Sequence, residues 1–179
     1  GGFMQYLGSY IRGLPLFRLR DRRRTRLINV KSMAITFHTE GVDFPAIDKK
    51  KVADWIRSVA KKYGKRTGEI AYLFCNDEQI LTVNQQFLGH DYYTDIITFD
   101  YSEEDYLSGD IFVSIDTVRS NAELYSVSFQ EELYRVVIHG ILHLCGIKDE
   151  SEQEKEEMRE AENRALEKLT FLLSSRGVS

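Results

Sequence analysis

The alternation of apolar and polar residues along the chain predicts a protein built from strands and helices. Short runs rich in β-branched and aromatic residues predict strands, and longer runs with apolar residues every three or four positions predict helices. Strands are expected at 33–38, 68–75, 95–101 and 109–114, and helices at 49–63, 77–88, 115–125, 129–145 and 152–174. This order indicates an α/β or α+β fold, in which about five helices cover a mixed four-stranded sheet.

The helix expected at 129–145 is apolar on most of its surface, which is typical of a buried helix. A capping box formed by Ser128 and Glu131 marks its beginning. Its polar residues lie three or four positions apart and form one stripe, made of Glu132, Arg135, His139 and His143. Because a buried imidazole without a partner costs free energy, both histidines of this stripe need partners.

A metal ion is a partner that suits both histidines at once. His139 and His143 lie four residues apart, so they share one face of the helix. Gly146 then allows the chain to reverse, because glycine adopts left-handed backbone angles at little cost, and Asp149 can return a carboxylate to the same ion. The spacing predicts a metal site formed by these three ligands. The alternative is a pair of core histidines whose partners are other protein groups.

Two imidazoles and one carboxylate leave a coordination position open, which is typical of a catalytic zinc site. We expect one Zn²⁺ ion, which would activate a bound water and stabilise negative charge on an oxyanion or a phosphoryl oxygen. Asp149 lowers the net charge at the ion compared with a third histidine. Other divalent metals, including iron, are therefore expected to bind as well.

The helix of zinc proteases has the same ligand spacing, H-E-x-x-H-x-x-G-x-x-H. The glutamate that serves those enzymes as a base is replaced by Gly140 in this chain. Since glycine cannot accept a proton from the attacking water, a metallopeptidase is the less favoured function. Any other hydrolysis needs supporting groups from elsewhere in the chain.

The composition is that of an ordinary globular protein, but the charge is divided unevenly. Residues 1–32 hold eight basic residues and one acidic residue, whereas residues 33–179 hold sixteen basic and twenty-seven acidic residues. We expect a basic N-terminal extension at 1–32 and a single domain at 33–179. The extension has the character of an organellar transit peptide. Alternatively, Met33 is the true start and 1–32 are non-native or disordered, or their arginines contact phosphates.

The two cysteines, Cys75 and Cys145, lie in apolar stretches and are too few for a disulfide framework. This favours a reducing, cytoplasmic compartment. The chain shows no apolar run of the length of a membrane span, so we expect no membrane partner. Cys145 follows His143 by two positions and points away from the histidine stripe. We interpret it as a small core residue.

Four further motifs follow one another along the chain: NQQF at 84–87, YTDIITF at 93–99, GDI at 109–111 and HGILHLCG at 139–146. Together they resemble the YbeY family of metal-dependent endoribonucleases, over a stretch from about Met33 to the last helix. The resemblance implies an α/β fold with a metal in a cleft and single-strand-specific cleavage of RNA. It further implies maturation of the 16S rRNA 3′ end, ribosome quality control and association with the small ribosomal subunit.

The chain departs from the family pattern at two positions. Asp149 stands where the resemblance implies a third metal-binding histidine, and a carboxylate remains a competent ligand. Leu88 stands where it implies an arginine that would contact phosphate. Arg135, on the histidine stripe, could supply a replacement cation. The alternative for Arg135 is an ion pair with a neighbouring glutamate, Glu131 or Glu132.

Two carboxylates on family-like blocks are candidates for the catalytic base. Asp95 begins the third expected strand and Asp110 lies in the fourth, and either could orient or deprotonate a metal-bound water. We select Asp95 as the catalytic candidate. The structural alternatives are a turn cap at Asp95 and a turn at Gly109 and Asp110.

The sequence thus favours a metal-dependent endoribonuclease that acts on single-stranded rRNA. One alternative is a non-catalytic ribosome-assembly factor with a structural metal, which the leucine at position 88 supports. The metallopeptidase is the third hypothesis. The acidic character of 33–179 also indicates that RNA binding would use a local basic surface instead of the net charge of the domain.

Overall fold

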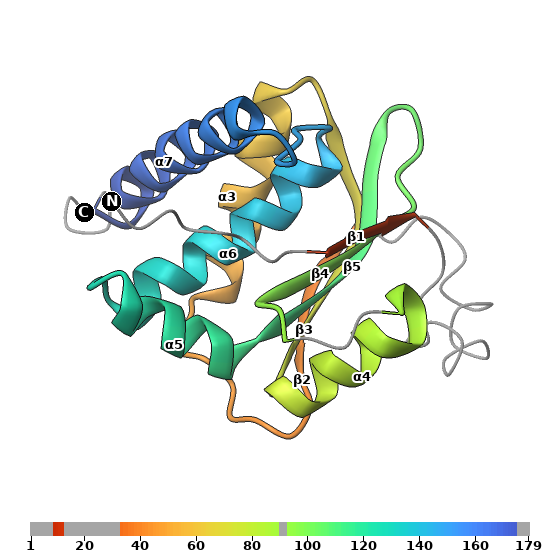
Figure 1. Ribbon diagram of the computed structural model, residues 1–179. Helices are drawn as coiled ribbons and strands as arrows, with labels where there is room; N and C mark the ends of the chain where they lie inside the picture. Colours follow the sequence, from red (N-terminus) through yellow and green to blue (C-terminus); the bar gives the residue numbers. More distant parts are fainter. Residues whose placement is uncertain (1–8, 13–32, 90–92, 175–179) are drawn as a thin grey trace.

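The computed structural model describes residues 9–12, 33–89 and 93–174, with only the backbone for 9–12 (Figure 1). Helices lie on both faces of a mixed sheet. α3 (Lys49–Lys62), α5 (Ile115–Leu124) and α6 (Phe129–Leu144) cover one face, and α7 (Glu152–Ser174) packs on α3 and α6 on this side. α4 (Asp77–Leu88) covers the other face. The larger hydrophobic core lies between the sheet and the four-helix side, and a smaller core lies under α4.

The sheet contains the four strands expected from the sequence, β2 (Ile35–Thr39), β3 (Arg66–Cys75), β4 (Ile96–Asp100) and β5 (Tyr106–Ser114). β4 is antiparallel to β5, while β2, β3 and β5 run parallel to one another. The predicted α+β fold with a mixed sheet is therefore confirmed. Whether the predicted metal site opens into a cleft stays a prediction.

A fifth strand, β1 (Ser9–Arg12), lies within the segment expected to be an N-terminal extension. It pairs in parallel with β4 and gives the strand order β1-β4-β5-β3-β2. The sequence analysis did not predict β1, because a four-residue run shows no clear alternation and its partner is an edge created only by folding. The other residues of 1–32 lie outside the described part of the chain.

All five expected helices are present within the described residues. They are α3 (Lys49–Lys62), α4 (Asp77–Leu88), α5 (Ile115–Leu124), α6 (Phe129–Leu144) and α7 (Glu152–Ser174). The capping residue expected at Ser128 marks the start of α6, and Ser151 and Glu154 form a reciprocal capping box at the start of α7. In α6, the Ser128 hydroxyl accepts a hydrogen bond from the backbone N–H of Glu131 at 3.1 Å, which satisfies a free donor of the first turn.

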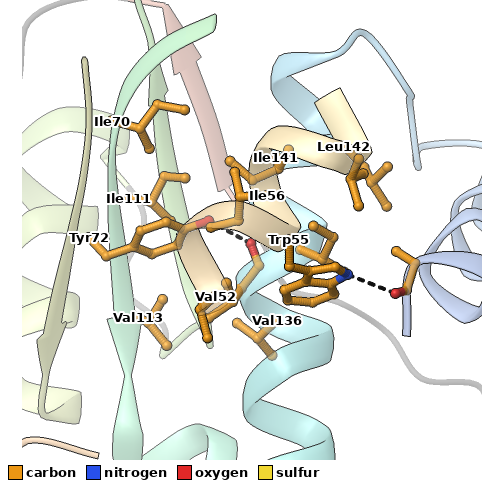
Figure 2. Close-up of a cluster of buried hydrophobic side chains, with 14 of the residues drawn as sticks. Val52, Trp55, Ile56, Ile70, Tyr72, Ile111, Val113, Val136, Ile141 and Leu142 are labelled. Atoms are coloured by element: carbon orange, nitrogen blue, oxygen red, sulfur yellow. Dashed lines mark hydrogen bonds between the residues drawn. The ribbon is translucent and has the colours of Figure 1, made fainter. Parts of the chain in front are cut away.

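Two buried hydrogen bonds hold the helices of the larger core in place (Figure 2). The indole N–H of Trp55 on α3 donates to the backbone carbonyl of Ala165 on α7 at 2.8 Å. The hydroxyl of Tyr72 on β3 donates to the backbone carbonyl of Val137 on α6 at 2.7 Å. Both aromatic side chains are fully buried, so each polar group needs its partner. α6 is thereby tied to the sheet, and α7 is tied to α3.

α6 lies so close to the sheet that Gly140 has little room for a side chain. A Cβ atom at this position would lie 3.1 Å from the terminal methyl groups of both Ile96 on β4 and Ile111 on β5. Gly140 therefore faces the sheet, and His139, one residue earlier, is directed to a different side of the helix. In the described part of the chain, no helix combines the length and the apolar character needed to cross a lipid bilayer.

We predict that Gly140→Ala destabilises the protein by about 1–3 kcal/mol, because two buried isoleucines must shift to accommodate the methyl group. Urea unfolding with an unchanged m-value measures this loss. Asn163→Ala, at an exposed position of α7, is the control for helix propensity alone. A Gly140→Ala protein that is more stable than the parent, as propensity alone dictates, would contradict the close packing.

Candidate metal centre

Two histidine rings project from the last turns of α6. His139 is fully buried, whereas His143 is partly exposed. Their ring centroids lie 4.6 Å apart, and the ring planes are nearly perpendicular. After α6 ends at Leu144, Gly146 adopts a φ of +96° and the chain turns back toward the rings. This reversal, expected from the position of the glycine, places Asp149 beside both histidines.

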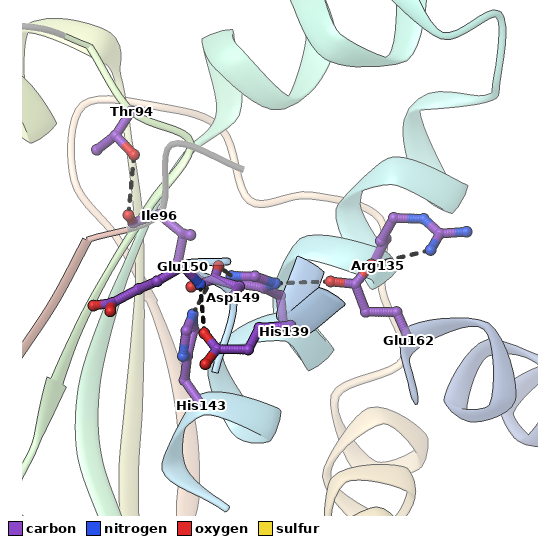
Figure 3. Close-up of polar contacts among 9 residues, drawn as sticks. Thr94, Ile96, Arg135, His139, His143, Asp149, Glu150 and Glu162 are labelled. Atoms are coloured by element: carbon purple, nitrogen blue, oxygen red, sulfur yellow. Dashed lines mark hydrogen bonds and ion pairs between the residues drawn. The ribbon is translucent and has the colours of Figure 1, made fainter. Parts of the chain in front are cut away.

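One oxygen of Asp149 faces the Nε2 atoms of both rings (Figure 3). Asp149 Oδ2 lies 3.2 Å from His143 Nε2 and 3.3 Å from His139 Nε2. Ligands at 2.0–2.2 Å from a tetrahedral zinc ion are separated from one another by about 3.3 Å, so these two separations fit such an ion. The structure brings together the three residues predicted as ligands, with all ligand atoms within 4.8 Å of one another. That they hold a metal, and which one, stays a prediction.

The second nitrogen of His139 contacts a carboxylate that the sequence analysis missed. His139 Nδ1 and Oε2 of Glu162, on α7, are 2.7 Å apart, and the Glu162 side chain is fully buried. From the sequence alone, the run of glutamates in 152–174 is expected to form a solvent-exposed face, and for the buried Glu162 that expectation is wrong. The signal that could have found it is its position, because Glu162 lies four residues after the buried Met158 and next to the buried Ala161.

Arg135 is held by the same carboxylate. Its Nη1 donates to Glu162 Oε1 at 3.1 Å, and the Arg135 side chain is only 11% exposed. The sequence left open whether Arg135 contacts phosphate or pairs with Glu131 or Glu132. The structure shows an ion pair, but with Glu162. Arg135 therefore pairs with a buried carboxylate beside His139, and its side chain is largely shielded from solvent.

The carboxylates on either side of His139 control its protonation. Burial alone would lower the pKa of His139, but the hydrogen bonds and negative charges of Asp149 and Glu162 raise it to about 10. For Asp149, burial acts to raise the pKa, but hydrogen bonds from both imidazoles and their positive charges lower it well below its usual range. In the absence of a metal, an imidazolium thus lies between two carboxylates.

Asp95, the predicted catalytic residue, is buried just before β4. Neither of its carboxylate oxygens accepts a hydrogen bond from a side chain of the described residues, whereas the backbone N–H groups of Asp95 and Ile96 act to lower its pKa. Burial raises the pKa of Asp95 to about 6, with the charge of His139 lowering it and the charge of Glu162 raising it. The same region contains Glu132, also buried, whose pKa is raised to about 7 by burial and then by the charge of Asp95. The charge of Asp95 therefore interacts with that of His139.

Asp110, the second candidate base, is on the wrong face of the sheet. Its neighbour Ile111 packs against Gly140 of α6, and side chains alternate along a strand. Asp110 accordingly shares the opposite face with Phe112, which belongs to the smaller core under α4. The structure does not bring Asp110 to the histidines, because the strand periodicity directs it away.

Two further positions behave as apolar core residues. Leu88, where a phosphate-contacting arginine was implied, packs at the end of α4 against the smaller core. Cys145 packs against the larger core, and burial raises its pKa to about 12, so the thiol keeps its proton at neutral pH. The group of possible ligands found in the described residues contains no cysteine. The interpretation of Cys145 as a small core residue fits this environment.

Comparisons with known proteins agree on one family. Residues 35–170 match the family model described as "Endoribonuclease YbeY". A protein of that name from Bacteroides thetaiotaomicron is 61% identical over 134 residues, which cover 75% of this chain and 98% of that protein. One from Parabacteroides distasonis is 60% identical, covering 75% and 94%. The solution structure of a Thermotoga maritima protein is similar with a TM-score of 0.57 and 31% identity, covering 80% of this chain and 93% of that one.

We predict that zinc binding releases a proton, because the imidazolium of His139 must become neutral before Nε2 can bind a metal. Zinc affinity should then increase with pH between 6 and 8, by about tenfold per unit. Calorimetric titration in buffers of different ionisation enthalpy counts the proton. His38→Ala, on the edge strand β2, should behave like the parent. An affinity that is equal at pH 6 and pH 8 would contradict the charged histidine.

Proposed function

The chain belongs to the YbeY endoribonuclease family, and from this premise we propose that it is a metal-dependent endoribonuclease that cleaves single-stranded rRNA. The observation that carries the proposal is the convergence of His139, His143 and Asp149. Relatives that are 60–61% identical to this chain carry the name endoribonuclease. The convergence supplies this chain with the donor set that such an activity needs.

The three converging side chains would hold the ion, with one protein oxygen between two imidazole nitrogens. A divalent cation bound there would lower the pKa of a water ligand and stabilise negative charge on a phosphoryl oxygen. Three protein ligands are typical of catalytic centres, which keep a position for water or substrate. Zn²⁺ is the ion we propose, with other divalent metals tolerated because Asp149 is a carboxylate.

Asp95 is proposed as the group that accepts the proton. With a pKa of about 6, it is ionised at neutral pH and still basic enough to take up a proton. A fully buried carboxylate that receives no hydrogen bond from any side chain of the described residues costs folding free energy, which supports a role other than stability. Its charge also interacts with that of His139, which supports a place next to the metal ligands.

The finer assignments come from the family. We propose that the substrate is the 3′ end of 16S rRNA, that the protein acts in ribosome quality control, and that it associates with the small ribosomal subunit in the cytoplasm. Residues 33–179 are acidic overall, so contact with RNA would rely on local basic groups. One such group is the exposed lysine face of α3, which includes Lys49, Lys50, Lys61 and Lys62.

A second candidate is a non-catalytic ribosome-assembly factor that uses the metal for stability. The apolar Leu88, which packs on the smaller core, favours it because no cation stands at that position to contact phosphate. A metallopeptidase is not favoured. The position that would carry its base, Gly140, faces the side chains of Ile96 and Ile111 and not the histidines.

We predict that His139→Ala and His143→Ala each abolish cleavage of single-stranded rRNA fragments, because each removes one of three ligands. Treatment of the parent protein with a chelator should have the same effect, and zinc should restore activity. The edge-strand variant His38→Ala is the matched control. Cleavage that survives both histidine substitutions would contradict the endoribonuclease. The assembly factor would be supported if the parent protein does not cleave RNA and if the histidine variants co-sediment with small ribosomal subunits as well as the parent does.

We predict that Asp95→Asn lowers the cleavage rate by about 10²–10⁴-fold, the usual contribution of a general base. The same change should alter the pH dependence of stability. The folded-state pKa of about 6 lies above the ordinary value of 3.8, so the parent loses stability as pH rises from about 4 to 6. Relative to the parent, the metal-free variant should gain about 3 kcal/mol across that interval. Urea unfolding at several pH values measures this difference. If the free energy of unfolding changes with pH in the same way for the parent and for Asp95→Asn, the buried charge is contradicted.

A further inference from the structure

A buried carboxylate holds the His139 ring from the side opposite to the proposed metal. Glu162 and His139 are both fully buried, and Glu162 Oε2 lies 2.7 Å from His139 Nδ1. A ring whose Nδ1 faces Glu162 has its Nε2 on the other side, where Asp149 Oδ2 lies at 3.3 Å. Figure 3 shows His139 between the two carboxylates. The orientation of the metal-facing nitrogen is thus linked to a residue on another helix.

We propose that Glu162 is a positioning residue that keeps the proton of His139 on Nδ1 and leaves Nε2 free to bind a metal, and that Arg135 holds Glu162 in place. The inference rests on the proposed metal-dependent function and extends it to residues that do not touch the ion. Carboxylates that accept a hydrogen bond from a metal-binding histidine fix its tautomer and raise its basicity.

The two oxygens of Glu162 have different partners, and this is why a carboxylate is needed. Oε1 accepts from Arg135 Nη1 at 3.1 Å, and Oε2 accepts from His139 Nδ1. A glutamine has one acceptor oxygen and one NH₂ donor. If the glutamine oxygen still accepts the hydrogen bond from Arg135, its NH₂ group donates to Nδ1 of His139. The neutral His139 ring then carries its own proton on Nε2. The metal-facing nitrogen of His139 would be blocked.

The placement of Glu162 depends on the core and not on the exposed surface of α7. Ala165, less than one turn later, accepts the indole hydrogen bond of Trp55 at 2.8 Å. Met158 and Ala161 are buried on the same side of the helix. α7 is therefore anchored to the larger core on either side of Glu162, and the carboxylate reaches His139 in a defined position. The last helix contributes to the centre although it supplies no ligand.

Glu162→Gln tests the proposal, with the exposed Glu160→Gln on the same helix as the matched control. The zinc dissociation constant of each protein is measured by competition with a chromophoric chelator. We expect Glu162→Gln to weaken zinc binding by about 10–100-fold and Glu160→Gln to leave it within about twofold of the parent. Nitrogen-15 NMR of the zinc-loaded parent should show the His139 proton on Nδ1. In the metal-free Glu162→Gln protein, at a pH where the His139 ring is neutral, the proton should be on Nε2.

A second variant keeps the test decisive if Glu162→Gln does not fold, which circular dichroism reports. Arg135→Met retains the carboxylate but frees it to rotate, and should weaken zinc binding by more than about twofold but less than Glu162→Gln. Folded variants of Glu162 and Arg135 that bind zinc as tightly as the parent would overturn the positioning role alone. A parent protein that does not bind zinc at all would overturn the metal-dependent function and this inference with it.

Discussion

A buried imidazole with a carboxylate at each of its two nitrogens is the feature on which the rest of this structure depends. His139 lies between Asp149 and Glu162, at 3.3 and 2.7 Å. Two carboxylates with so little exposure to solvent need a positive charge between them, and either a proton or a metal ion at Nε2 of His139 can supply it. The raised pKa of His139 reflects the first state, and the separations of Asp149 Oδ2 from the two imidazole nitrogens fit the second. Binding a metal would therefore exchange one cation for another.

The fold serves this centre by bringing two helix faces together. The glycine at position 140 lets α6 approach β4 and β5, so that the neighbouring histidine turns toward α7. Trp55 fixes α7 against α3, and Tyr72 fixes α6 against β3. Each of these contacts belongs to the core, yet together they set the geometry of the site. The surroundings of Asp95 show the cost of such an arrangement, since its carboxylate is buried there without a hydrogen bond from any side chain of the described residues.

Much of this architecture could be predicted from the sequence because local signals agreed with one another. A cap such as Ser128 marks a helix start, and the periodicity of apolar residues identifies the five helices and four strands. The spacing of two histidines, a glycine and an aspartate likewise indicates the ligand set, because a helix and a turn determine it locally. β1 was not predicted, since a strand of four residues depends on the edge of β4 for its pairing.

Sequence reasoning missed or misplaced the residues whose role depends on which faces of the helices and strands pack together. Glu162 lies in a helix rich in glutamates, and only its position on the apolar stripe distinguishes it. The partner of Arg135 was sought among neighbours in sequence and lies on α7 instead. Asp110 could be excluded only once Ile111 was seen against α6. Tertiary contacts decide these assignments, and local patterns do not contain them.

A crystal structure of the zinc-loaded protein tests the central claim most directly. The account predicts one zinc ion about 2.0–2.2 Å from His139 Nε2, His143 Nε2 and an oxygen of Asp149, with Glu162 still bonded to His139 Nδ1. Zinc bound elsewhere on the protein, or held at the histidines with the Asp149 carboxylate turned away, would contradict it.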